Sequence, residues 1–359
     1  MDNKKTRAYI ENLLKLEQKY RSELLLILVA NVEGETVLCD DYNNTSVLSE
    51  YYTLDEYETL SSSYKKMGYE VLSYFNETDF ISAVLQKQFD AKQKKILVIN
   101  SAQTGTYIGR KSLIPAFCEH LKIMHTGSNP YVVSLCRDKF HSNAILRSYT
   151  SNYTATYLYT ENGWLGNRHP QQDIKLIAKL NGESASIGLN EDNVFTYSTN
   201  TDKYLKGLLK QYKQPIIVQP FISGYEIELP IICESDKLPL IAAGIKIGDD
   251  KMLGDKFLDY KSRFFHLYSF YNFNESFSEF SQLVEAEAIT VARILGIEGF
   301  GRVDFRITPS GEIYVSDIST NPHITKDSSY SFVFQELGYS YSEMLATQIG
   351  LTLLKHSFS

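Results

Sequence analysis

The chain has 359 residues, of which 43% are hydrophobic and 22% are charged, and its formal net charge is −7. This length is enough for two or three domains with real cores, and the composition is that of an ordinary soluble globular protein. The negative charge argues against a nucleic-acid-binding protein, which would normally carry a basic face, whereas an anionic small ligand can still be bound by local lysines.

Neither a secretion signal nor a membrane span is expected. The N-terminal stretch MDNKKTRAYIENLLK is polar and charged, and the longest apolar run, LLLILVA, is too short to cross a bilayer. The four cysteines are scattered, without the CxxC spacing of a zinc or redox site, which is typical of reduced thiols in the cytosol. We therefore expect a cytoplasmic protein.

The first part of the chain alternates helix-like and strand-like segments, the pattern of an open α/β sheet. A helical pattern near 4–20 precedes the strand LLLILVAN, and a second near 53–68 precedes the strand YEVLSYF. The segment KKILVINSA is apolar enough to be a central parallel strand.

From about residue 150 the pattern becomes rich in antiparallel strands. The expected strands are YTATYLYT, DIKLIAKLNG, PIIVQPF, YEIELPIICE and LIAAGIKIG. A long helix at QLVEAEAITVARILG has an apolar stripe along one face and should end at Gly296. The last helix should begin with a capping box of Ser340 and Glu343. The coarse expectation is an α/β N-terminal domain followed by an α+β remainder.

The segment GRVDFRITPSGEIYVSDISTNP, residues 301–322, predicts a β-hairpin with Ser310-Gly311 at its turn. With that turn, the sequence numbers of two residues that lie opposite each other add up to 621. Because strand side chains alternate between faces, the polar residues of both strands then share one face of the hairpin.

This register places Asp304 opposite Asp317 and Arg302 opposite Ser319. Like charges directly opposite each other destabilise a sheet, so the pair requires an explanation. One interpretation is a solvated face on which the repulsion is screened, and the hairpin alone favours it. The other is a Mg²⁺ site, because this hard ion takes one or two protein carboxylates and fills its octahedron with water and phosphate oxygens.

Two loops are candidates for binding phosphate. The stretch GTYIGRKS lacks the spacing of a Walker A loop, and the chain has no GxGxxG fingerprint. In KLNGESASIG, Lys179 precedes small residues that let backbone N–H groups approach a phosphate, namely Gly182, Ser184, Ala185 and Ser186. The alternative for this loop is an ordinary hairpin turn.

Taken in order, these segments resemble the ATP-grasp superfamily and, within it, the D-alanine–D-alanine ligases and their relatives. The resemblance runs through GRKSLIPAFCEHLKIMHTGSNPYVVSLCRDK, AKLNGESASIG, IIVQPFISGYEIELPII, FLDYKSRF, the hairpin and SSYSFVFQELGYSYSEML. Residues 1–100 match only in general character. The resemblance implies a three-part architecture, with an N-terminal Rossmann-like domain over 1–128, a central ATP-grasp subdomain over 129–219 and a C-terminal ATP-grasp subdomain over 220–359.

The same resemblance implies a set of nucleotide contacts. The residues are Lys139 and Lys179 for the ATP phosphates, Gly182, Ser184, Ala185 and Ser186 for the loop that covers them, Gln219, Phe221 and Ile222 for adenine, and Glu226 for ribose. Arg302 would stabilise the tetrahedral intermediate, Arg263 would reach the γ-phosphate and the substrate carboxylate, and Ser328 would bind the acceptor's carboxylate.

Several positions depart from the family pattern. Asp304 and Asp317 would hold one Mg²⁺, but Ser319 stands where the family has an asparagine ligand, so a second ion is doubtful. His323 stands where the family has a glycine beside the oxyanion hole, and Arg263 replaces a lysine.

We therefore expect an ATP-dependent ligase that joins the carboxylate of an amino acid to an amine through an acyl phosphate, releasing ADP and phosphate. Its substrates would not be those of a cell-wall D-alanyl ligase, because the substrate-binding residues do not carry over. The alternative is a degenerate ATP-grasp protein that binds nucleotide and has a regulatory or structural role.

Composition alone also allows a Rossmann-type oxidoreductase, but the missing glycine fingerprint counts against that function. The expected partners are ATP, Mg²⁺ and small substrates, without nucleic acid or membrane, and relatives are often homodimers.

Overall fold

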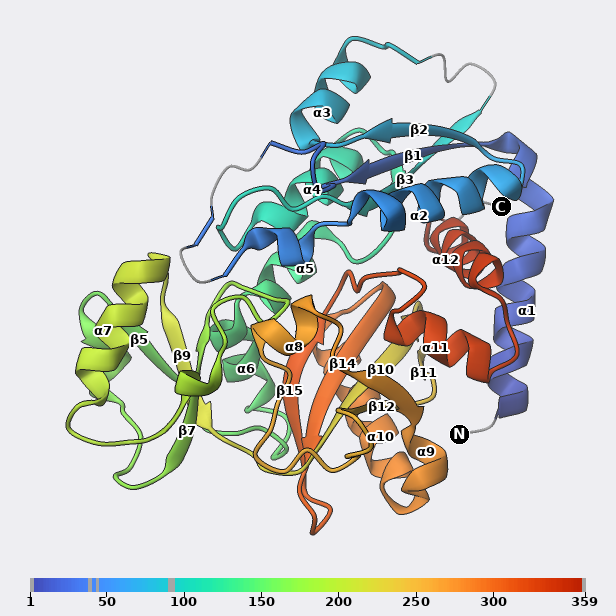
Figure 1. Ribbon diagram of the computed structural model, residues 1–359. Helices are drawn as coiled ribbons and strands as arrows, with labels where there is room; N and C mark the ends of the chain where they lie inside the picture. The colour runs from blue at the N-terminus through green and yellow to red at the C-terminus, as the bar shows by residue number, and fades with distance from the viewer. Residues whose placement is uncertain (1–2, 38–40, 43–44, 90–93, 357–359) are drawn as a thin grey trace.

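In the computed structural model, the described residues are 3–37, 41–42, 45–89 and 94–356, and they form three β-sheets in chain order. The expected sequence of an α/β part followed by a mixed remainder is confirmed (Figure 1). The domain boundaries expected near residues 128 and 219 stay predictions. Among the described residues, no helix has both the length and the apolar character that crossing a membrane would require.

The first sheet is entirely parallel, with the strand order β2-β1-β3-β4. All seven residues of β1 are buried, because helices cover both faces of this sheet. Its elements are β1 (Leu24–Ala30), α2 (Leu54–Lys66), β2 (Glu70–Tyr74), α3 (Glu77–Leu85), β3 (Lys95–Ser101), α4 (Leu113–His120) and β4 (Met124–His125).

The second sheet is antiparallel, with the order β6-β5-β9-β7-β8, and α7 packs its apolar face on it. Two short helices, α5 (Pro130–Arg137) and α6 (Lys139–Leu146), connect it to the first sheet. Its elements are β5 (Tyr157–Thr160), β6 (Gly163–Trp164), β7 (Lys175–Leu180), β8 (Val194–Thr196), α7 (Thr201–Tyr212) and β9 (Ile216–Pro220).

The third sheet is also antiparallel, with the order β13-β12-β10-β14-β15 and with β11 paired to β10. Its strands are β10 (Tyr225–Cys233), β11 (Lys237–Pro239), β12 (Ala243–Lys246), β13 (Ser269–Asn272), β14 (Gly299–Ile307) and β15 (Ile313–Ser319). The remaining helices are α1 (Asn3–Tyr20), α8 (Tyr260–Phe264), α9 (Phe273–Ser276), α10 (Ser278–Leu295), α11 (Ser329–Glu336) and α12 (Tyr341–Lys355).

Helix α10 covers one face of the third sheet with the stripe that the sequence predicted. Val284, Ala288, Val291 and Leu295 are buried there, and Gly296 ends the helix in the left-handed conformation. The capping box expected at the start of α12 is also present. Because α10 occupies one face of the sheet, the side chains of the opposite face are left to form a site.

The turn expected at Ser310-Gly311 is wrong by one residue. The N–H of Gly311 donates to the carbonyl of Thr308 at 2.9 Å, and the N–H of Thr308 donates to the carbonyl of Glu312 at 2.9 Å. The loop therefore contains Pro309 as well, and Gly311 takes a positive φ of 88°. This is the three-residue hairpin in which a type I turn is followed by a left-handed residue.

The expected pairs of the hairpin are nevertheless confirmed, because a bulge compensates for the turn. Near the turn the paired numbers sum to 620, and a register shift leaves Ser316 as an extra residue on β15. Beyond it the sum is 621, so Asp304 lies opposite Asp317 and Arg302 lies opposite Ser319.

Gly350→Ala tests the close approach of α12 to α1, which lie side by side (Figure 1). An added Cβ would lie 2.2 Å from the carbonyl oxygen of Leu13, so we expect a loss of about 1–3 kcal/mol in the free energy of unfolding. Gly207→Ala, on the exposed side of α7, is the matched control. Its Cβ meets nothing within 4 Å, so it should stabilise by about 1 kcal/mol through helix propensity. Equal stabilities in denaturant unfolding would contradict this packing.

Candidate active site

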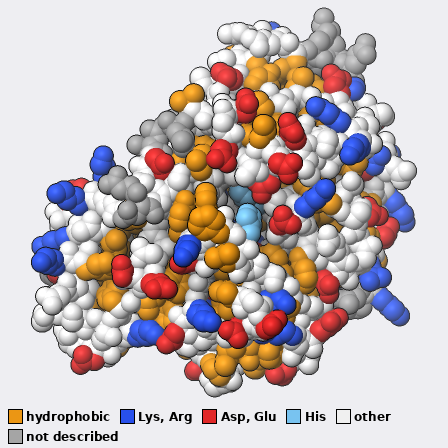
Figure 2. Space-filling view, in the orientation of Figure 1, with side chains coloured by type: hydrophobic (Ala, Val, Ile, Leu, Met, Phe, Trp, Pro, Cys, Tyr) orange, Lys and Arg blue, Asp and Glu red, His pale blue; other side chains and the backbone are white. Residues whose placement is uncertain are grey.

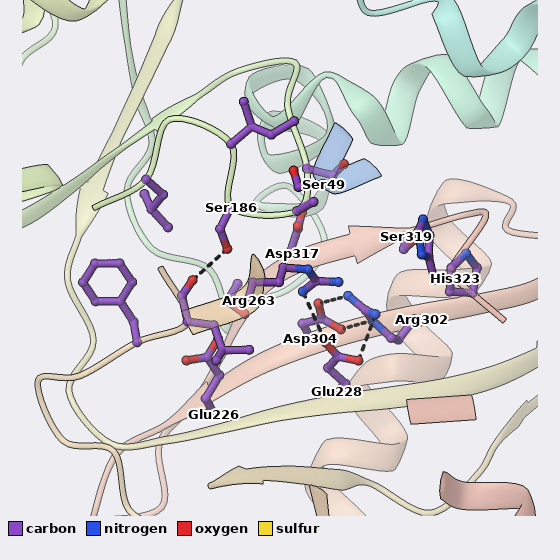
Figure 3. A pocket seen from close by; sticks show the side chains of 18 of the residues that line it. Ser49, Ser186, Glu226, Glu228, Arg263, Arg302, Asp304, Asp317, Ser319 and His323 are labelled. Carbon is purple, nitrogen blue, oxygen red and sulfur yellow. Dashed lines mark hydrogen bonds and ion pairs between the residues drawn. The ribbon is translucent and has the colours of Figure 1, made fainter. Parts of the chain in front are cut away.

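A cavity of about 350 Å³ is lined by residues from the second and third sheets, from the loops around them and from the N-terminal part of the chain, Glu50 and Lys111 among them (Figure 3). Of the predicted site residues, only Gly182 does not line it. Those that do are Lys139, Lys179, Ser184, Ala185, Ser186, Gln219, Phe221, Ile222, Glu226, Arg263, Arg302, Asp304, Asp317, Ser319 and Ser328. On the face drawn in Figure 2, acidic and basic side chains are interspersed, and histidine side chains are visible near its centre. The structure thus brings together residues that are almost 190 positions apart in the sequence.

Strand alternation explains why the third sheet can carry this site. On β10, Ile227 and Leu229 are buried in the core beneath α10, whereas Glu226 and Glu228 line the cavity. On β14 the same division places the apolar odd-numbered residues under α10 and the charged even-numbered residues in the cavity. The charged residues of β14 are Arg302, Asp304 and Arg306.

Three carboxylates form a row across this face. Glu228 pairs with Asp304 between β10 and β14, and Asp304 pairs with Asp317 between β14 and β15. Arg302 binds both oxygens of Asp304 at 2.7 Å and reaches Glu228 at 2.8 Å, and Lys139 Nζ lies 3.1 Å from Asp317. Sequence reasoning missed Glu228, although the alternation of YEIELPII already placed it on the same face as Glu226.

Burial and the neighbouring charges shift the pKa values of the carboxylates in this row. Burial raises the pKa of Asp304 to about 7, and Arg302 counteracts this while Glu228 adds to it. Burial also opposes ionisation of Asp317, but Lys139 and Lys179 outweigh it and lower its pKa. The described residues hold no group of three His, Cys, Asp or Glu side chains arranged for a metal. Two opposed carboxylates do fit one Mg²⁺, which needs only one or two protein carboxylates besides phosphate and water oxygens.

Two lysines approach this row from the second sheet and from α6. Lys179 lies near the end of β7, and its Nζ donates to the carbonyl of the bulged residue Ser316 at 3.3 Å. Burial lowers the pKa of Lys179, and Asp317 partly opposes this. Lys139 begins α6, and its N–H donates to the carbonyl of Asn181, which ties α6 to the loop after β7. Both ammonium groups therefore lie where an anionic ligand of the cavity would meet them.

The small-residue loop after β7 adopts an unusual backbone conformation. Ala185 and Ser186 have φ values of 51° and 56°, so two consecutive residues are left-handed. Successive N–H groups in such a turn form a concave surface that favours anions. Ser186 Oγ donates to the carbonyl of Leu258 at 2.7 Å, which links this loop to the segment before α8 (Figure 3).

At the far end of the cavity, the predicted adenine and ribose contacts lie together. Gln219 is on β9, with Phe221 and Ile222 directly after the strand. Arg306 supports this end, because its Nε donates to the carbonyl of Ile222 at 2.9 Å and its Nη1 lies 2.8 Å from Glu226.

The remaining predicted contacts are Arg263, for the γ-phosphate and the substrate carboxylate, and Ser328, for the acceptor's carboxylate. Arg263 is on α8, with its Nη1 3.9 Å from Glu228. Ser328 caps α11, and its Oγ also donates to the carbonyl of Thr325 at 2.7 Å.

His323 lies in the cavity beside Ser319, on the side away from Glu226 (Figure 3). Its ring stacks on Tyr52 with a centroid distance of 5.1 Å, and its Nε2 lies 3.2 Å from the carbonyl of Glu50. Burial lowers the pKa of His323 to about 4, and the positive charges of Lys111 and Arg263 contribute. A neutral imidazole thus fills space beside the row of carboxylates.

Comparison with known proteins identifies the fold as that of the ATP-grasp ligases. The crystal structure of D-alanine–D-alanine ligase from Bacillus anthracis, complexed with ATP, superposes with a TM-score of 0.68 at 18% identity, covering 93% of this chain and 99% of that one. The VanG D-Ala:D-Ser ligase from Enterococcus faecalis gives a TM-score of 0.64 at 17% identity, covering 92% and 99%.

Residues 173–350 match the family model described as D-ala D-ala ligase C-terminus. A D-alanine–D-alanine ligase from Streptococcus mutans is 24% identical over 258 residues, which are 68% of this chain and 69% of the relative. One from Natranaerobius thermophilus is 25% identical over 262 residues, 70% and 68% of the two chains. The resemblance inferred from the sequence is confirmed: this chain is similar to the D-alanine–D-alanine ligases of the ATP-grasp superfamily, and this similarity indicates an ADP-forming ligase that makes a carbon–nitrogen bond.

His323→Gln should make the protein less sensitive to acid. The pKa of His323 is about 4 when folded and near 6.5 when unfolded, so its contribution to stability is complete above pH 6.5 and is lost as the pH falls towards 4. Between pH 7 and pH 5, the free energy of unfolding should fall by about 2 kcal/mol less in the variant than in the wild type. Urea unfolding of both proteins at both pH values measures this. Equal losses of unfolding free energy in the wild type and the variant would show that the pKa of His323 is not lowered by folding.

Proposed function

We propose that this chain binds Mg·ATP in the cavity, phosphorylates the carboxylate of an amino acid and transfers the resulting acyl group to an amine. We further propose that its substrates are not two D-alanines. The observation that carries the proposal is the row of Glu228, Asp304 and Asp317, opposed by Arg302 and two lysines within one cavity.

Nucleotide binding would use the charges from both sheets. Asp304 and Asp317 would hold Mg²⁺, which supplies neutralisation of the phosphate charge when it is bound. Lys139 and Lys179 would contact the phosphates. The covering loop, residues 182–188, would add hydrogen bonds from the N–H groups around its left-handed residues Ala185 and Ser186. The adenine would lie along Gln219, Phe221 and Ile222, with Glu226 on the ribose. Charge neutralisation is needed because an anionic carboxylate must approach an anionic phosphate.

The chemistry would proceed in two displacements. A carboxylate oxygen of the first substrate attacks the γ-phosphorus, the bond from phosphorus to the β–γ bridging oxygen breaks, and ADP leaves. The amine nitrogen of the second substrate then attacks the acyl carbon, the carbon–oxygen bond to phosphate breaks, and the nitrogen loses a proton. Arg302, held by Glu228 and Asp304, would stabilise the oxyanion of this second step, because a fixed guanidinium needs no reorganisation as charge develops.

The substrate end of the cavity supports a specificity other than D-alanine. The half-buried ring of His323 fills space where the family has a glycine, and its stacking on Tyr52 fixes it there. Arg263 replaces a lysine, and its planar guanidinium binds a carboxylate with two parallel hydrogen bonds rather than as a point charge. Acidic Glu33 and Asp327 line the same cavity, so a zwitterionic amino acid would find both signs of charge there.

ADP release from Mg·ATP, measured against a panel of L- and D-amino acid pairs, tests this function. We expect release that depends on a pair of amino acids and that is small with two D-alanines. Asp317→Asn should reduce turnover by at least about 100-fold, because it removes a carboxylate of the proposed metal site.

Asp250→Asn is the control for this variant, because Asp250 pairs with Lys256 on the surface and both side chains are 62% exposed. It should leave turnover unchanged. Efficient turnover of two D-alanines would overturn the proposed specificity. ADP release that survives in Asp317→Asn would overturn the proposed metal site.

A further inference from the structure

Five charged side chains form a buried cluster beside the phosphate-covering loop. They are Glu50, Arg110, Lys111, Arg137 and Glu183, and sequence reasoning gave none of them a role. The side chains of the two glutamates and the two arginines are at most 4% exposed, and that of Lys111 is 14% exposed. Only Glu183 belongs to the covering loop, while Glu50 follows β1 in the N-terminal part of the chain.

Every carboxylate in this cluster is shared between cations. Glu50 lies 2.8 Å from Arg137, 3.3 Å from Arg110 and 3.2 Å from Lys111. Glu183 lies 2.9 Å from Arg110 and 3.2 Å from Arg137. The three cations hold the pKa of Glu50 well below its usual range, although burial opposes this. Removing one member would take away hydrogen bonds that the other members cannot all replace, and would change the balance of buried charges.

The cluster also binds the backbone of the covering loop directly. The N–H of Ser184 donates to Glu50 Oε1 at 3.0 Å. Arg137 donates through Nε to the carbonyl of Gly182 at 2.5 Å and through Nη1 to the hydroxyl of Ser184. Gln214 accepts from the N–H of Gly182 and donates to Glu183. The residues before the left-handed turn are therefore fixed from several directions.

This support matters because the turn itself is unfavourable. Left-handed φ values are unfavourable for residues with a side chain such as Ala185 and Ser186, and such conformations persist only where the surroundings determine them. The hydroxyl of Ser186 donates a hydrogen bond to the carbonyl of Leu258, which holds the turn at its C-terminal side. The residues on its N-terminal side, Gly182 to Ser184, are held by the cluster.

We propose that Glu50, Arg137 and Glu183 are positioning residues that hold the covering loop in its phosphate-binding conformation before nucleotide arrives. Nucleotide affinity then depends on the N-terminal part of the chain, because Glu50 lies there and outside the matched family region of 173–350. The inference rests on the proposed ATP site, but the conformation of the loop can be tested without ATP.

Arg137→Met is the direct test, since it removes the guanidinium while keeping an unbranched apolar side chain. Hydrogen exchange of the amides in 182–188, measured without nucleotide, should accelerate at least tenfold. The KM for ATP should rise roughly tenfold, as expected for the loss of charge-assisted hydrogen bonds, with a smaller change in kcat. Arg137→Lys should restore part of both effects, because it returns the charge without the planar fork.

Arg21→Met is the matched control, because Arg21, directly after α1, binds the buried Glu17 of that helix through two 2.8 Å hydrogen bonds, away from the loop. It should lower the thermal midpoint without changing loop exchange or KM. If Arg137→Met does not fold, the nearly isosteric Glu183→Gln carries the same expectations.

Unchanged loop exchange in a folded variant would overturn the proposal, as would an equal change in Arg21→Met. A wild type that does not bind ATP would refute the proposed function, and loop exchange would still decide whether the cluster positions the loop.

Discussion

The repulsion between like charges on one face of the third sheet is the constraint on which the rest of the site depends. Glu228, Asp304 and Asp317 stand next to one another on three adjacent strands, where water cannot fully screen them. Arg302 and Lys139 offset part of the repulsion, whereas burial, together with Glu228 and Asp317, raises the pKa of Asp304. A face arranged in this way is stabilised by a bound cation and its anionic ligand.

The surrounding fold keeps this face rigid. Helix α10 fills the opposite side of the sheet with apolar side chains, so the strands cannot rotate their charged residues into solvent. The second sheet supplies Lys179 and the covering loop, and the loop is fixed in turn by the buried cluster around Glu50. Parts of the chain from around all three sheets therefore meet at one set of charges.

Local patterns were enough to predict much of this arrangement. Alternation in the hairpin predicted the pairing of Asp304 with Asp317, and the apolar stripe of α10 predicted the covered face. The pairing was right although the turn was one residue off, because the bulge at Ser316 shifted the register back. Neither departure could be inferred locally, since a bulge depends on packing against neighbouring elements and its extra residue has no distinctive sequence.

The polar contacts between residues far apart in the chain could not be predicted from the sequence. Glu50 and Arg137 are 87 positions apart, and no periodic pattern connects a short helical turn after β1 to the end of α5. Glu228 is a different case, because it shares a strand face with Glu226 and could have been recognised from alternation alone.

The most direct test of the account is calorimetric titration of the wild type and Asp317→Asn with ADP, in the presence and absence of Mg²⁺. The account predicts that Mg²⁺ strengthens ADP binding to the wild type at least tenfold, equivalent to about 1.4 kcal/mol, and that most of this gain is lost in Asp317→Asn. ADP binding that is absent, or that is indifferent to Mg²⁺ in both proteins, would contradict the claim that the opposed carboxylates form a metal–nucleotide site.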